Sequence, residues 1–94
     1  MEKATFEAAC KAMMTRADAL WPDRVIGPVI SHQLMWEVVR EGERPEIVGS
    51  HYLARLVESD GYDDYTVARG SGATEEEAWA ALEADVARLE NPEG

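Results

Sequence analysis

The sequence predicts an α+β fold in which a helix, a three-stranded antiparallel sheet and a second helix follow one another. Apolar residues recur every three or four positions near both ends of the chain, which is the period of a helical face. In the middle of the chain, apolar and polar side chains alternate on either side of an Asp-Gly turn, as in a hairpin. We therefore expect a two-layer α-β-β-β-α sandwich, with residues 1–94 forming a single acidic domain.

The first helix is predicted over residues 5–21. Its apolar face is formed by Phe6, Ala9, Cys10, Met13, Ala17 and Leu20. Thr5 is the expected N-cap, and Pro22 ends the helix because the residue before a proline is disfavoured in the α conformation. Cys10 is the only cysteine, and its place on this face predicts a packed thiol rather than a nucleophile.

The first strand is predicted over residues 31–40. One of its faces carries Leu34, Trp36 and Val38. The preceding residues 25–30 contain Gly27 and Pro28, so we expect an extended connector there that adds at most a short edge strand.

The second strand is predicted over residues 47–57, where Gly49 is expected to mark a bulge. One face carries His51, Leu53, Arg55 and Val57, and the other carries Tyr52, Ala54 and Leu56. Both faces mix polar and apolar residues, so the sequence leaves open which face is buried. The third strand follows the Asp-Gly turn at residues 65–69 and is expected to break at the glycine-rich residues 70–72.

The last helix is predicted to begin after Thr74, which forms a capping box with Glu77. Glutamates in the first turn suit the positive end of the helix dipole. Its apolar face consists of Ala78, Ala81, Leu82, Val86 and Leu89.

Charge is distributed unevenly along the chain. Residues 58–94 hold eleven of the nineteen Asp and Glu residues, opposed only by Arg69 and Arg88, so they carry about −9 of the formal net charge of −10. Either these residues merely solvate a small domain, or they form an anionic patch complementary to a basic partner. The candidate partner-binding residues are Glu58, Asp60, Tyr62, Asp63, Asp64, Glu75, Glu76, Glu83 and Glu90. Tyr65 and Trp79 are further aromatic candidates.

The order of elements, together with the small-residue loop at residues 70–74, resembles the double-stranded-RNA-binding domain. That family places lysines at the start of its last helix to hold phosphates, whereas this chain has Glu75, Glu76 and Glu77 there. Direct nucleic-acid binding by this surface is therefore not expected.

A second resemblance covers residues 52–89. The strand, the Asp-Gly hairpin, the next strand and the helix opening at residues 72–78 are similar to the antitoxin HicB. This resemblance implies a cytoplasmic protein that binds a small RNA-cleaving toxin. The chain lacks the proline-glycine segment expected before the Thr-Glu-Glu motif of that family.

No residues form a catalytic, metal or cofactor motif. His32 and His51 are the only histidines, and neither lies in a short Cys/His spacing or near the partners of a catalytic triad. The N-terminus lacks the pattern of a secretory signal and no apolar run approaches the ~20 residues of a membrane span, so we expect a cytoplasmic location.

These observations predict a non-enzymatic protein that binds and blocks a basic, nucleic-acid-handling partner by imitating nucleic acid. Phage-borne inhibitors of host defence, including anti-CRISPR proteins, have this size and charge. The alternatives are a HicB-like antitoxin, or a homodimer that assembles through an exposed sheet face or edge strand.

Overall fold

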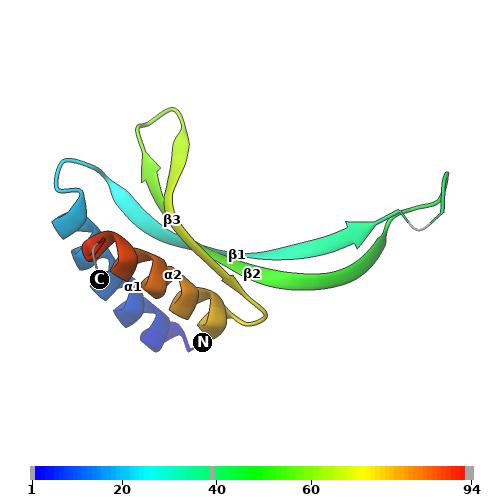
Figure 1. The fold of residues 1–94 in the computed structure, drawn as a ribbon, viewed down its shortest axis with the longest axis horizontal. Helices are drawn as coiled ribbons and strands as arrows, with labels where there is room; N and C mark the ends of the chain where they lie inside the picture. The colour runs from blue at the N-terminus through cyan, green and yellow to red at the C-terminus, as the bar shows by residue number, and fades with distance from the viewer. Residues whose placement is uncertain (1, 39, 93–94) are drawn as a thin grey trace.

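The predicted order of elements is confirmed by a computed structural model, which describes residues 2–38 and 40–92. The elements are α1 (Lys3–Leu20), β1 (Ile26–Glu37), β2 (Glu46–Ser59), β3 (Asp64–Gly72) and α2 (Glu75–Glu90). The strands form one antiparallel sheet in the order β1-β2-β3. Both helices lie on the same side of this sheet (Figure 1), so the fold has the two expected layers.

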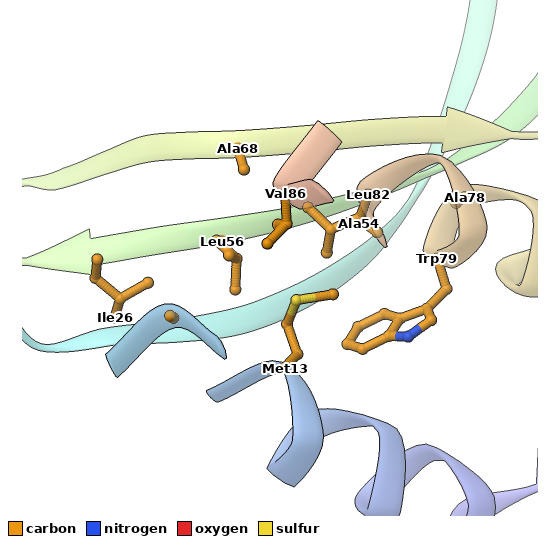
Figure 2. Packing of buried hydrophobic residues seen from close by; sticks show 10 residues of the cluster. Met13, Ile26, Ala54, Leu56, Ala68, Ala78, Trp79, Leu82 and Val86 are labelled. Atoms are coloured by element: carbon orange, nitrogen blue, oxygen red, sulfur yellow. The ribbon is translucent and has the colours of Figure 1, made fainter. Parts of the chain in front are cut away.

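The core decides which face of β2 is buried. Ala54 and Leu56 are fully buried against the helices, whereas Leu53 and Arg55, on the opposite face, remain half-exposed. The buried cluster consists of Met13, Ala17, Ile26, Ala54, Leu56, Ala68, Ala78, Trp79, Leu82 and Val86. Figure 2 shows these side chains converging from the two helices and the sheet.

Two glycines of β3 bring α2 unusually close to the sheet. A Cβ atom built on Gly70 would lie 2.2 Å from the backbone nitrogen of Leu82, and one on Gly72 would lie 2.5 Å from Cβ of Glu77. From the sequence, these glycines were expected to break the strand. They belong to β3 instead, because only a residue without a side chain allows the helix backbone to approach so closely.

The start of α1 differs from the sequence-based expectation. The helix begins at Lys3 and is preceded by Glu2 as N-cap, which forms no side-chain cap hydrogen bond. The prediction that Thr5 caps the helix is therefore wrong, because Thr5 lies within the first turn. The C-terminal end of α1 agrees with the prediction. The Trp21 N–H donates to the Ala17 carbonyl at 2.8 Å, and the helix ends before Pro22.

The first strand also begins earlier than expected. β1 runs without interruption from Ile26 through Gly27 and Pro28. β1 is an outer strand of the sheet, so a proline can occupy it without removing a hydrogen bond from a central ladder. The connector predicted at residues 25–30 is therefore largely part of β1.

The predicted capping box forms at the start of α2 with its second hydrogen bond displaced by one residue, from Thr74 to Ala73. The Thr74 hydroxyl accepts the Glu77 N–H at 3.1 Å, and the Glu77 carboxylate accepts the Ala73 N–H at 2.9 Å. The helix is turned slightly from the predicted face: Trp79 is buried at 5% exposure, whereas Leu89 is 40% exposed.

The sheet extends well beyond its helices. β3 ends at Gly72 opposite Tyr52, so β1 and β2 continue as a two-stranded ribbon that projects away from the helices (Figure 1). We call residues 33–38 and 46–51 the β-arm. The pairing shifts by one residue between Met35 and Trp36, next to the bulge expected at Gly49. The arm explains a radius of gyration of 16.0 Å, against about 12 Å for a compact chain of this length.

Candidate functional site

Residues 60–64, which form the β2–β3 turn and the first residue of β3, are held by hydrogen bonds within the segment; we call them the acidic turn. The Asp60 carboxylate accepts the N–H groups of Tyr62 and Asp63 at 2.8 and 2.7 Å. Gly61 has a φ of 92°, a conformation that glycine adopts without strain. The bonds from Asp63 and then Tyr62 lower the pKa of the Asp60 carboxyl below its ordinary value. The carboxylate is therefore occupied in holding the turn.

This turn presents an aromatic ring to solvent. Tyr62 is 96% exposed, the highest value among the large hydrophobic residues described as exposed. Asp63 and Asp64 follow it directly and are exposed as well. Glu58, at the base of the turn, is half-buried and forms an ion pair with Arg24 at 3.3 Å. The acidic turn thus combines an exposed tyrosine with two carboxylates that point away from the core.

The glutamates of α2 have unequal surroundings. Glu76 and Glu83 are exposed, and Glu75 is half-buried beside a hollow lined by Phe6, Pro28 and Tyr52, among others. Glu90 accepts a hydrogen bond from Arg16 Nε at 3.2 Å, which lowers the pKa of its carboxyl below the ordinary value. Glu76, Glu83 and Glu90 recur every seven residues along α2, but Glu90, the last of them, is held by Arg16 of α1.

The two remaining aromatic candidates also differ. Trp79 is a core residue whose ring makes an edge-to-face contact with Phe6 at 5.6 Å between centroids. The suggestion that Trp79 anchors a partner is therefore wrong, because it is on the helix face that packs against α1 and the sheet. Tyr65 is 51% exposed at the start of β3 and stays a candidate.

The histidines do not form a reactive site with the cysteine. His32 stacks on Tyr52 with ring centroids 4.4 Å apart, whereas His51 lies on the opposite face of β2. Cys10 is half-buried, packs against the core, and has its thiol pKa raised by burial and then by Glu7. Within residues 2–38 and 40–92, no group of three His, Cys, Asp or Glu side chains could hold a metal ion. None of the helices in this part of the chain is long and apolar enough to cross a membrane.

The β-arm has an apolar surface that was not predicted from the sequence. Its exposed large hydrophobic residues are Leu34, Met35, Trp36, Val38, Ile47 and Val48, each between 45% and 67% exposed. Trp36 and Ile47 are direct partners in the β1–β2 register. The alternation of Leu34 and Trp36 was visible in the sequence, but it indicated only a strand with one apolar face. Neither helix reaches this part of the sheet, so the apolar side chains stay in water (Figure 1).

Comparison of the chain with models of protein families, with curated proteins and with solved structures found no match.

Proposed function

We propose that this protein is a non-enzymatic binding module that docks its acidic turn on a basic, nucleic-acid-handling protein and blocks it. The observation that carries the proposal is the nearly complete exposure of Tyr62 on a turn held rigid by Asp60. Tyrosine in such a position loses little conformational entropy on binding and is enriched at protein interfaces.

The charge around Tyr62 specifies the kind of partner. Asp63 and Asp64 directly follow Tyr62 in the chain and are exposed, and Glu83 is a further exposed carboxylate, on α2. With a net charge of −10, the chain is repelled by phosphates and attracted to surfaces that themselves bind phosphates. Carboxylates held on rigid elements would occupy such a surface in place of nucleic acid, and the partner's own ligand would then be excluded.

Two classes of protein act in this way. An inhibitor of host defence, of the anti-CRISPR type encoded by phages, would block a nucleic-acid-binding effector in the cytoplasm. A HicB-like antitoxin would instead cover a small RNase toxin. The alternative of an antitoxin is supported by the order strand, turn, strand and helix over residues 52–89, which is the order that the resemblance implies.

The test compares two pairs of charge reversals. The first variant carries Asp63→Lys and Asp64→Lys and changes the acidic turn. The control variant carries Asp18→Lys and Asp23→Lys, which change the net charge by the same amount at one exposed residue of α1 and one exposed residue that follows it. Tagged wild type and both variants would be used to capture proteins from a nuclease-treated bacterial lysate. The proposal expects a basic protein that is lost with the acidic-turn variant, retained with the control, and released by salt between about 50 and 500 mM.

The captured protein is then purified and offered a nucleic acid and this chain together. Competition between the two for the partner supports the proposal. Simultaneous binding of both, or equal capture by the wild type and the acidic-turn variant, would contradict it.

A further inference from the structure

We infer that the β-arm is a self-association surface, and that two copies of this chain pack their arms against each other. This inference does not depend on the proposed function, because the arm and the acidic turn lie at opposite ends of β2. The arm is the part of the sheet that neither β3 nor a helix covers (Figure 1).

The apolar side chains of the β-arm are exposed to solvent, and burying them would be favourable. Trp36 is 62% exposed and its cross-strand partner Ile47 is 67% exposed. Leu34 lies two residues from Trp36 on the same face of β1 and is 54% exposed. An isolated two-stranded ribbon is marginally stable in water, and the largest exposed apolar patch of a protein is often an interaction site.

The area available matches a weak dimer interface. Leu34, Trp36, Val38 and Ile47 share one face of the arm and are 54% to 67% exposed, so this face presents on the order of 400 Å² per copy. Two such faces together would bury about 800 Å², which is the size of a weak or transient interface. A twofold axis would bring the same residues of each copy into contact, as in most homodimers.

Charge permits a second copy to meet at this surface. Trp36 and Ile47 have Glu37 and Glu46 as charged neighbours in the strands, and the adjoining loop contains the Arg40–Glu43 ion pair. Most of the net negative charge lies in residues 58–94, of which the glutamates at the start of α2 come nearest to the arm, because β3 ends at Gly72 opposite Tyr52. A contact through Trp36 and Ile47, near the end of the arm that is farthest from Tyr52, keeps these carboxylates of the two copies apart.

The test measures the dimer dissociation constant by sedimentation equilibrium. Trp36→Lys and Ile47→Lys each place a charge in the proposed contact, from different strands. Val25→Lys is the matched control, since Val25 is 78% exposed and precedes β1 at the end opposite the arm. Circular dichroism establishes that each variant is folded, and the pair of arm variants keeps the test informative if one of them is not.

We expect the wild type to dimerise with a dissociation constant below about 100 µM. Either arm variant should raise this constant at least about tenfold, and Val25→Lys should leave it unchanged. Higher salt should tighten this dimer by screening the repulsion between acidic chains, whereas it should weaken binding to a basic partner. A monomeric wild type at about 100 µM, or a dimer unaffected by both arm variants, would overturn it.

Discussion

Arg16 on α1 and Glu90 at the end of α2 form an ion pair that joins the first helix to the last. The guanidinium Nε lies 3.2 and 3.3 Å from the two carboxylate oxygens. Because the pairing with Arg16 depresses the pKa of Glu90 in the folded state, its stabilising effect is present above the unfolded pKa of about 4.3 and is lost as the pH falls through the lower folded value.

Replacing Arg16 with Gln should therefore lower the urea midpoint slightly at pH 7 and hardly at all at pH 3. The effect is small because both side chains are partly exposed to solvent, at 29% and 36%. Arg40→Gln is the control, because Arg40 pairs with Glu43, three residues away in the same loop. An equal loss at both pH values would show that Arg16 acts through its packing and not through its charge.

Gly70→Ala should destabilise the fold by about 1 to 3 kcal/mol. The new methyl group would meet backbone atoms of Ala81 and Leu82, which cannot move without shifting α2. Gly27→Ala is the matched control, since no atom lies within 4 Å of a Cβ built there. Urea unfolding followed by circular dichroism measures both, and equal midpoints for the two variants would refute the close-packing argument.

Leu82→Ala should cost about 2 to 5 kcal/mol, because Leu82 is fully buried at the centre of the core (Figure 2). Leu89→Ala removes the same atoms from a residue of the same helix that is 40% exposed, so its effect should be much smaller. Thermal and chemical unfolding would rank the two variants. A larger loss for Leu89→Ala would mean that α2 is rotated from the orientation described.

Asp60→Ala should loosen the acidic turn without unfolding the domain. The substitution removes the acceptor of the Tyr62 and Asp63 N–H groups, which then exchange with solvent. Asp60→Asn keeps a side-chain oxygen acceptor and should preserve the turn. Amide hydrogen exchange by NMR is the measurement, and unchanged exchange at both amides in Asp60→Ala would show that the backbone alone holds this turn.

Several features followed from local chemistry and could be predicted. Thr74 and Glu77 form their capping box within four residues of each other, and burial of Leu82 follows from helical periodicity. The Asp-Gly turn is equally local, since Gly61 supplies the positive φ and Asp60 accepts the adjacent N–H groups. Such interactions depend on sequence spacing, which is why the order of elements was predicted correctly.

The sequence by itself thus determined the succession of helices and strands, the acidic turn and the strong negative charge of the second part of the chain. Tertiary structure alone decided that Trp79 is buried and Trp36 exposed, because burial depends on which elements overlie one another. It also decided that Glu90 is paired with Arg16, a contact between side chains 74 residues apart. The spacing of apolar residues along the chain does not determine which part of a sheet a helix packs against. The β-arm is exposed because both helices end before they reach it (Figure 1).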